Sequence, residues 1–314
     1  MSTIIEVSKY NKKFKKNSVG EFSFMIKKGE ITALLGVSGS GKSVLINSIV
    51  SCYKKFSGNI KINEKSIKKA GGFKQNMLVG FYTQIDFSLQ SFSLIQFLLN
   101  MSMIMGLKKK DAKERINYWI DFFELTDSAT KKVKNFSWGM KNRVNLILGF
   151  LKEPEILILD EPGANLDSYW RNKIKNLLIQ YKSQGKTIII TSHNIDEISE
   201  IIDNYLVIEN GKLLFEGTTK QLNIYTKYKI YVKEEYEVEN FREFLNQRNI
   251  KSFKYDNIEN SLTIAIANYK ELNYIFLYLI KNNLPMKNLV KLPTNMESIH
   301  KALEDSAAKE KNNK

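Results

Sequence analysis

The chain has 314 residues, 43% of them hydrophobic and 26% charged, with a formal net charge of +15. This composition predicts a folded protein of about two domains and excludes an extensively disordered chain. One cysteine, Cys52, and two histidines exclude an internal disulfide framework and a Cys/His metal centre. The N-terminal segment lacks the apolar core of a signal peptide, and the most apolar run, 94–107, is too short and too polar to span a bilayer. We therefore expect a soluble protein of a reducing compartment.

The positive charge is carried mainly by lysine, which clusters at 12–16, 108–110 and 131–134. Arginine is the residue that reads phosphates and bases through bidentate hydrogen bonds. This balance therefore argues against sequence-specific DNA recognition and predicts no specific nucleic acid partner. Solvated lysine surfaces and attraction to an anionic membrane surface remain two open explanations of the charge.

Residues 1–220 are predicted to form a first domain of strands and helices. In chain order the pattern predicts strands at 4–7, 21–26 and 31–35, a glycine-rich loop at 36–41, a helix at 43–53, strands at 59–63 and 77–82, helices at 94–125 and 137–151, a strand at 156–159, a helix at 167–184 and a strand at 187–191. Wholly apolar strands separated by helices are typical of a parallel sheet that is buried on both faces. Gly211 and Gly217 indicate a closing hairpin at the end of this domain.

Residues 221–305 are predicted to form a second, smaller α+β domain. The pattern predicts a strand at 229–233, a helix at 240–249, strands at 250–255 and 262–267, a helix at 270–282, a strand at 287–291 and a last helix at 296–303. The order β-α-β-β-α-β is typical of a ferredoxin-like module. The charged segment 306–314 is expected to be a flexible tail.

One motif predicts phosphate binding. The sequence GVSGSGKS fits the pattern G-x-x-x-x-G-K-[S/T] and lies between a predicted apolar strand and a predicted helix. Its glycines let the backbone wrap around phosphate groups, and the helix N-terminus adds its dipole. Lys42 is expected to reach the β- and γ-phosphates of ATP, and Ser43 is expected to bind Mg²⁺. The candidate ATP-binding residues are Gly36, Ser38, Gly39, Ser40, Gly41, Lys42, Ser43 and Val44.

A second motif, ILILDE at 156–161, places two carboxylates at the end of a buried strand. Unpaired charges in such a place are costly, so their presence indicates a function. Asp160 is expected to bind the metal and its water shell. Glu161 is expected to polarise the attacking water as a general base, a role worth about 10²- to 10⁴-fold in rate.

The order of these motifs resembles that of the ATP-binding cassette (ABC) family, which contains the ATPase subunits of ABC transporters. The resemblance covers residues 1–217. It implies an α/β fold, the P-loop NTPase nucleotide-binding domain with a helical subdomain at about 88–150. The implied activity is hydrolysis of ATP with Mg²⁺ as cofactor.

Several residues acquire roles only through this resemblance. Gln84, after the strand VGFYT, matches the glutamine that contacts Mg²⁺ and the transport partner. Ser137 and Gly139 in NFSWGMKNR match the signature sequence, which meets the γ-phosphate held by a second cassette. His193 in IIITSHN matches the switch histidine that contacts the γ-phosphate.

Tyr10 in SKYNKKF matches the aromatic residue that stacks on adenine, and Phe14 is a second candidate for this role. Residues 164–167 match the D-loop at the dimer seam. Three places depart from the family pattern: Trp138 stands where a glycine is usual, Gln96 where an acidic residue is usual, and Gly163-Ala164-Asn165 where Thr-x-Gly is more usual. A bulky residue at 138 resembles the branch that exports antibiotics and peptides or gives immunity to them. Its effect on hydrolysis is left open.

The resemblance also implies partners. Two cassettes, identical or different, would pair head to tail with each ATP between the Lys42 loop of one chain and Ser137 of the other. An integral membrane permease would hold them at the cytoplasmic face of the cell membrane. The apolar face of 94–107 is either its docking surface or part of a packed helical core. The second domain resembles the C-terminal extension of the exporter branch, and a stabilising or dimerising appendage is the alternative. Two other functions stay open, a soluble ABC-type ATPase not tied to a permease and a weakly hydrolysing regulatory subunit.

Overall fold

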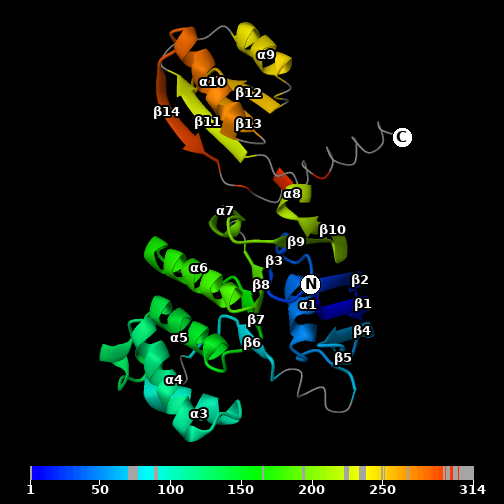
Figure 1. Cartoon of the computed structure of the whole chain (residues 1–314), viewed down its shortest axis with the longest axis vertical. Helices are drawn as coiled ribbons and strands as arrows, with labels where there is room; N and C mark the ends of the chain where they lie inside the picture. Colours follow the sequence, from blue (N-terminus) through cyan, green and yellow to red (C-terminus); the bar gives the residue numbers. More distant parts are fainter. Residues whose placement is uncertain are drawn as a thin grey trace. The chain divides into compact units, whose positions relative to one another are not determined.

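The structure is a computed structural model that describes residues 2–69, 77–87, 91–164, 166–192, 195–222, 226–232, 238–248, 250, 252–266, 269–292, 294, 298–299 and 303. The chain divides into two compact units (Figure 1). The first unit comprises residues 1–193 and 197–218, and the second comprises residues 194–196 and 219–314. No helix within the described ranges is long and apolar enough to cross a membrane.

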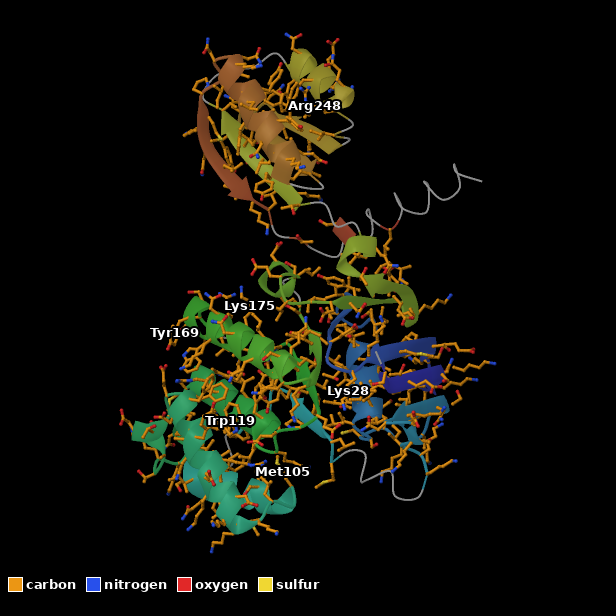
Figure 2. The ribbon with its side chains drawn as sticks, in the orientation of Figure 1. Lys28, Met105, Trp119, Tyr169, Lys175 and Arg248 are labelled. Atoms are coloured by element: carbon orange, nitrogen blue, oxygen red, sulfur yellow. The ribbon has the colours of Figure 1, made fainter. Side chains whose placement is uncertain are left out.

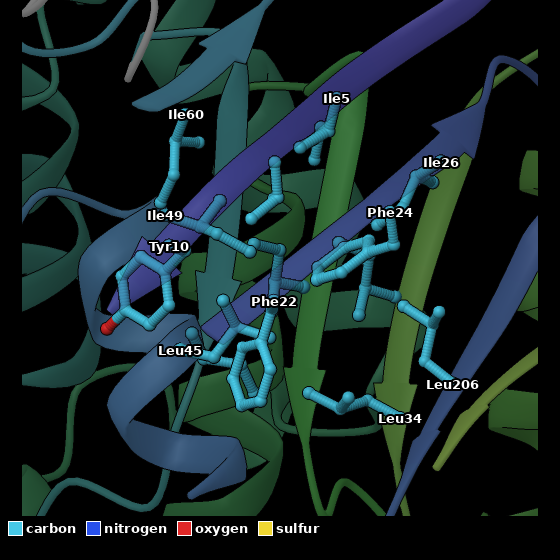
Figure 3. Packing of buried hydrophobic residues seen from close by; sticks show 14 of the residues in the cluster. Ile5, Tyr10, Phe22, Phe24, Ile26, Leu34, Leu45, Ile49, Ile60 and Leu206 are labelled. Atoms are coloured by element: carbon cyan, nitrogen blue, oxygen red, sulfur yellow. The ribbon is translucent and has the colours of Figure 1, made fainter. Parts of the chain in front are cut away.

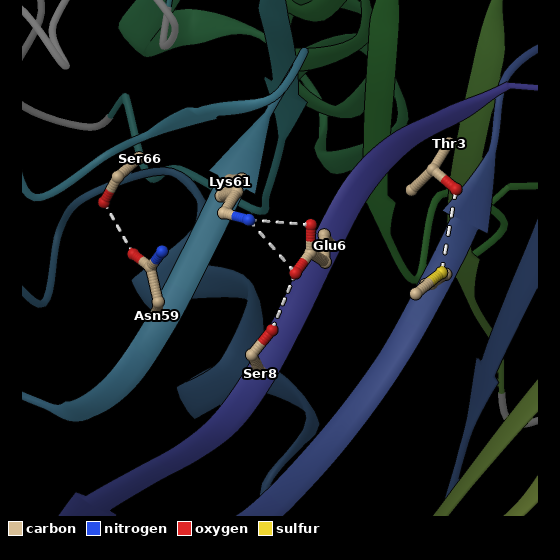
Figure 4. A network of polar contacts seen from close by, with 7 residues as sticks. Thr3, Glu6, Ser8, Asn59, Lys61 and Ser66 are labelled. Atoms are coloured by element: carbon tan, nitrogen blue, oxygen red, sulfur yellow. Dashed lines mark hydrogen bonds and ion pairs between the residues drawn. The ribbon is translucent and has the colours of Figure 1, made fainter.

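An antiparallel sheet opens the first unit. Its strands are β1 (Thr3–Lys13), β2 (Ser18–Lys27), β4 (Ser57–Ile62) and β5 (Lys65–Ser66), in the spatial order β2-β1-β4-β5. The alternation of β2 buries Phe22, Phe24 and Ile26 on one face. The other face is polar: the Lys61 ammonium lies 3.1 Å from the Glu6 carboxylate, which also accepts a hydrogen bond from the Ser8 hydroxyl (Figure 4).

The second sheet carries the strands that the apolar runs predict. Its order is β10-β9-β3-β8-β7-β6. The strands are β3 (Ile31–Leu35), β6 (Val79–Tyr82), β7 (Ile156–Asp160), β8 (Thr187–Thr191), β9 (Asn204–Glu209) and β10 (Lys212–Thr218). The five strands from β9 to β6 pair in parallel, and β10 closes an antiparallel hairpin with β9. The predicted parallel, doubly buried sheet is confirmed, because every residue of β3 and β8 is buried.

A shared hydrophobic core joins the two sheets to α1 (Lys42–Ile49). Figure 3 shows side chains of this core, with Leu45 of the helix beside Phe22 of β2 and Leu206 of β9 beside Phe24. Full burial of one such side chain is worth about 1.5–3 kcal/mol. The core therefore fixes the start of α1 relative to the end of β3.

Four further helices belong to the first unit, with α5 packed against β6 and β7 and α6 packed against β8. They are α3 (Leu94–Ile104), α4 (Lys109–Phe122), α5 (Trp138–Phe150) and α6 (Ser168–Ser183). The shorter elements of the chain are η1 (Thr126–Ser128), η2 (Val133–Asn135), α7 (Ile195–Ile198) and α8 (Thr219–Leu222). Trp119 of α4, labelled in Figure 2, packs with its ring centroid 5.1 Å from that of Phe150 on α5. Aromatic packing thus ties α4 to α5.

The stretch 94–125, predicted to be helical, contains two helices, because the chain turns between α3 and α4. Gly106 has φ +83°, a left-handed conformation that favours glycine and ends a helix. The start of α3 is well defined. Ser93 and Gln96 form a capping box there, in which each side chain bonds the backbone N–H of the other residue.

The second unit has the predicted order of elements. It contains β11 (Thr226–Val232), α9 (Val238–Gln247), β12 (Ser252–Asp256), β13 (Ser261–Ile266), α10 (Tyr269–Lys281) and β14 (Met286–Lys291). The sheet is antiparallel in the order β12-β13-β11-β14. Asp196 belongs to this unit and accepts hydrogen bonds from the backbone N–H and hydroxyl of Thr294, at 2.5 and 2.9 Å. Most of the predicted last helix, 296–303, lies outside the described residues.

Candidate nucleotide-binding site

The loop between β3 and α1 requires glycine at its two ends. Gly36 has φ +156°, and a Cβ there would lie 2.2 Å from the Ile208 carbonyl oxygen. Gly41 has φ +113°, and its Cβ would lie 2.7 Å from a methyl group of Val19. The segment from Val37 to Gly39 is exposed between these two fixed points. The loop therefore offers its backbone to solvent while its two ends are held by packing.

The N-terminus of α1 is open to an anion. Gly41 is the N-cap residue and supplies no side-chain hydrogen bond, and the first turn holds no acidic residue. The backbone N–H groups of this turn and the helix dipole favour a phosphate group. Ser43 is exposed at this turn, and Val44 is half-buried one residue further on.

Lys42 is buried at the base of the loop. Its ammonium donates hydrogen bonds to the carbonyl oxygens of Gly36 and Val37, at 2.7 and 3.1 Å. Burial lowers the pKa of Lys42, and the negative charges of Glu161 and Asp160 oppose this decrease. A buried ammonium held by two loop carbonyls is a cation that a phosphate group can recruit.

The acidic end of β7 is organised by a residue of the next strand. The register of β7 and β8 places Asp160 opposite Thr191. The Thr191 hydroxyl donates a 2.7 Å hydrogen bond to Asp160 Oδ1 and accepts a 3.0 Å hydrogen bond from the Glu161 backbone N–H. Glu161 itself has φ +57°, an uncommon conformation for a residue with a side chain. Thr191 thus fixes both acidic residues.

Sequence reasoning missed Thr191. The sequence feature that could have identified it is its position as the last residue of a buried strand, which runs parallel to the strand that ends in Asp160. Its neighbour two positions on, His193, lies outside the described residues.

The residues present fit a nucleoside triphosphate and a magnesium ion. Among the described residues, the buried hydroxyl of Ser40 makes no hydrogen bond, which leaves a polar atom at the loop for a ligand. Gly39 leaves the exposed middle of the loop without a side chain and has no other atom near its Cβ position, so the backbone there can approach a phosphate closely. Hydroxyl and carboxylate oxygens from Ser43 and Asp160 form the type of donor set that Mg²⁺ prefers.

The signature segment lies at the start of α5. Ser137 is exposed and caps this helix, accepting a 3.2 Å hydrogen bond from the Met140 N–H. Trp138 is 64% exposed, and the Lys141 ammonium lies 5.7 Å from its ring centroid. Gly139 is half-buried. The helix N-terminus is therefore open on the side that carries Ser137.

Gln84 is exposed just after β6. The following carbonyl, that of Ile85, accepts a 3.2 Å hydrogen bond from the Asn145 amide of α5. The segment around Gln84 is thus attached to the same helix that carries the signature residues.

The prediction that Tyr10 stacks on adenine is wrong. Tyr10 is fully buried, and its hydroxyl lies 2.7 Å from that of Ser48. Its ring is stacked on Phe22, with centroids 5.8 Å apart, and packs against Phe56 at 5.1 Å. Aromatic neighbours therefore occupy the surroundings of the ring, and no face is open to a base.

Phe14, the second candidate, is 45% exposed. Its ring meets that of Tyr53 edge to face at 6.2 Å. The Lys12 ammonium lies 5.4 Å from the Phe14 centroid and 5.0 Å from the Tyr53 centroid. Phe14 is the accessible ring of this pair, because Tyr53 is half-buried. Tyr10, in contrast, lies in the core and does not reach the surface.

The glycine-rich loop between β3 and α1 and the acidic end of β7 define a P-loop nucleotide-binding protein. Residues 19–164 match the protein family described as ABC transporter. The linearmycin resistance ATP-binding protein LnrL of Bacillus subtilis is 33% identical over 208 residues, covering 66% of this chain and 67% of that protein. Nod factor export ATP-binding protein I of Rhizobium sp. (strain N33) is 30% identical over 204 residues, covering 65% of this chain and 67% of that protein.

A solved structure of an ABC transporter component is also similar to this chain. CbiO1 of Clostridium perfringens, part of the ABC transporter complex CbiONQ, matches with a TM-score of 0.61 and 27% identity over 80% of this chain and 96% of that chain. The chain belongs to the ABC transporter family and is one of its ATP-binding ATPase cassettes.

Proposed function

We propose that this protein binds and hydrolyses ATP to power a membrane exporter of a peptide, an antibiotic or a lipid-like molecule. The observation that carries the proposal is the buried Lys42 ammonium at the loop after β3, at the same edge of the parallel sheet as Asp160 and Glu161 after β7. It unites a phosphate-binding cation with a candidate metal ligand and a candidate general base at one place. The names of the two exporter-type relatives support the transport role.

Each group has a defined part in hydrolysis. The loop N–H groups and Lys42 bind the phosphates, and the Lys42 ammonium exchanges its two carbonyl acceptors for phosphate oxygens. Ser43, Gln84 and Asp160 hold Mg²⁺, which when bound neutralises charge on the phosphate oxygens. Glu161 accepts the proton of the attacking water. His193 is assigned to the γ-phosphate from the family resemblance.

The second ATPase chain and the permease are also proposals. Ser137 and Gly139 stand at an accessible helix N-terminus, a geometry that suits a γ-phosphate held by another cassette. Exposed apolar side chains at Ile85, Phe92 and Ile95 follow Gln84 along the chain and suit a cytoplasmic segment of a permease. The protein would then lie at the cytoplasmic face of the membrane, bound to the permease.

The test uses a Glu161→Gln variant of the full chain, expressed with a tag in its native cell and fractionated with ATP present. Loss of the general base should stop hydrolysis and retain the ATP-bound pair with its partner. Recovery in membranes together with a protein of several spans is the expected result. Recovery with ribosomes, nucleic acid or soluble assembly factors would support a soluble ABC-type ATPase and overturn the exporter proposal. Wild-type protein without ATPase activity would overturn the catalytic proposal.

A further inference from the structure

Asn142 connects three segments of the first unit through one side chain. It lies in the second turn of α5 and is only 6% exposed. Its Oδ1 accepts a hydrogen bond from the Tyr82 hydroxyl, and its Nδ2 donates a 2.5 Å hydrogen bond to the Ala164 carbonyl. Tyr82 precedes Gln84 by two residues, and Ala164 follows Glu161 by three. One amide thus joins the helix of Ser137 to the segments of Gln84, a candidate metal ligand, and Glu161, the candidate general base.

The chemistry of these contacts requires an amide. Tyr82 is fully buried at the end of β6, and its phenolic hydroxyl donates a hydrogen bond to Asn142 Oδ1. The Ala164 carbonyl can only accept. A side chain between them must accept on one branch and donate on the other, which asparagine does and which leucine and ionised aspartate do not.

A second amide lies one turn further along the same face of α5. Asn145 is 4% exposed, and its Nδ2 donates the 3.2 Å hydrogen bond to the Ile85 carbonyl described above. The other end of the helix is held by close packing. A Cβ on Gly80 of β6 would lie 2.2 Å from the Gly149 carbonyl oxygen of α5. The C-terminal half of α5 therefore sits firmly on β6, and the amides set the position of its N-terminal half.

We propose that Asn142 is a positioning residue for ATP hydrolysis, which transmits the state of the Gln84 and Glu161 segments to the α5 N-terminus that carries Ser137. Buried polar contacts of this kind have few alternative partners, so a shift of either segment moves the helix start or breaks the link. The inference rests on the proposed function, because it assigns Ser137 to a second nucleotide site. It concerns turnover and leaves nucleotide binding to the Lys42 loop.

The experiment measures turnover per bound nucleotide in full-length Asn142→Leu, with binding titrated by a fluorescent ATP analogue. We expect turnover to fall about tenfold while affinity stays within about twofold, in line with the size of coupling effects in other proteins. Asn142→Gln, which retains both a donor and an acceptor, should recover part of the loss. Asn204→Leu is the matched control, because its amide bonds Glu30 at a strand end of the same unit, and its turnover should match wild type.

Tyr82→Phe keeps the inference testable if Asn142→Leu does not fold, because it removes a single oxygen. It should lower turnover per bound nucleotide in the same direction, by a smaller factor. Two results would overturn the positioning role alone. One is wild-type turnover in Asn142→Leu and Tyr82→Phe. The other is an equal loss of turnover in Asn204→Leu that follows a loss of thermal stability. Absence of turnover in wild type would overturn the proposed function as well, so the two failures are distinguishable.

Discussion

The hydroxyl of Thr191 and the carboxylate of Asp160 are 2.7 Å apart, across two adjacent parallel strands. The same hydroxyl oxygen accepts the N–H of Glu161. As a donor the hydroxyl orients the Asp160 carboxylate, and as an acceptor it holds the backbone of Glu161. Thr191 acts on the candidate metal site through Asp160 without being a ligand itself.

Replacement of this hydroxyl tests that role. Thr191→Val keeps the shape of the side chain and leaves Asp160 without its donor. We expect the Mg²⁺ concentration for half-maximal ATPase activity to rise about 10- to 100-fold, the usual effect of losing a group that orients a metal ligand. A magnesium titration of activity measures this. Thr191→Ser retains the hydroxyl and should stay near wild type; an equal shift in both variants would contradict the assignment.

Phe14, which is 45% exposed, is the remaining candidate for the residue that stacks on adenine. Phe14→Ala should weaken ATP binding by about 5- to 150-fold, because stacking of a base on an aromatic ring is worth about 1–3 kcal/mol. Binding of inorganic triphosphate should not change, since it has no base. Equilibrium titrations with both ligands measure the difference. An equal loss for ATP and triphosphate would show that Phe14 acts on the fold and not on adenine.

Tyr10→Phe serves as the companion variant. It removes the hydroxyl that contacts Ser48 in the core, so it should lower the free energy of unfolding by about 1 kcal/mol and leave ATP affinity unchanged. Thermal or urea unfolding and the same ATP titration give the two values. A loss of ATP affinity without a loss of stability would contradict the placement of this hydroxyl in the core, away from the nucleotide.

The error at Tyr10 shows what the sequence could not supply. Val7 is buried in β1, so strict alternation would bury Lys9 and expose Tyr10. The pairing with β2 shifts between Val7 and Tyr10, and Lys9 has φ +48°. This bulge reverses the phase of the strand and turns Tyr10 into the core. Bulges depend on pairing with a neighbouring strand, which a pattern of single residues does not reveal.

Other features follow from sequence because they are local. The strands 31–35 and 187–191 were predictable as uninterrupted apolar runs, and Gly36 and Gly41 as parts of a spaced motif. Thr191 and Asn142 act through partners far along the chain, at Asp160 and Ala164. Their roles depend on strand register and helix packing, so only the folded structure identifies them.

The carboxylate of Asp196 predicts a pH dependence of stability. Burial raises its pKa, but the two hydrogen bonds from Thr294 and the ion pair with Lys291 at 3.1 Å outweigh this and hold the pKa below its ordinary value of 3.8. Because the folded pKa lies below the unfolded one, ionised Asp196 stabilises the fold above about pH 4, and this contribution is lost as pH falls through the folded pKa.

Asp196→Asn should therefore lower the free energy of unfolding by about 1 kcal/mol at pH 7, a value already reduced for the partial exposure of the group. The difference from wild type should shrink near pH 3. Urea unfolding followed by circular dichroism at both pH values measures it. Lys291→Met should give a smaller loss that is not additive with Asp196→Asn. A difference that is the same at both pH values would contradict the role of the charge.

The indole of Trp138 decides between an active ATPase and a weakly hydrolysing regulatory subunit. Its ring is 64% exposed and contacts Lys141, and the cap at the start of α5 is made by the Ser137 hydroxyl and the Met140 N–H without it. Trp138→Gly should therefore leave this cap in place. We expect ATP turnover to change by less than about threefold, which is less than about 0.7 kcal/mol in activation free energy. Steady-state ATPase assays of wild type, Trp138→Gly and Trp138→Phe measure the effect. A gain of about tenfold or more in the glycine variant alone would mean that the indole holds the signature segment in a weakly hydrolysing state, and the regulatory function would replace the proposed one.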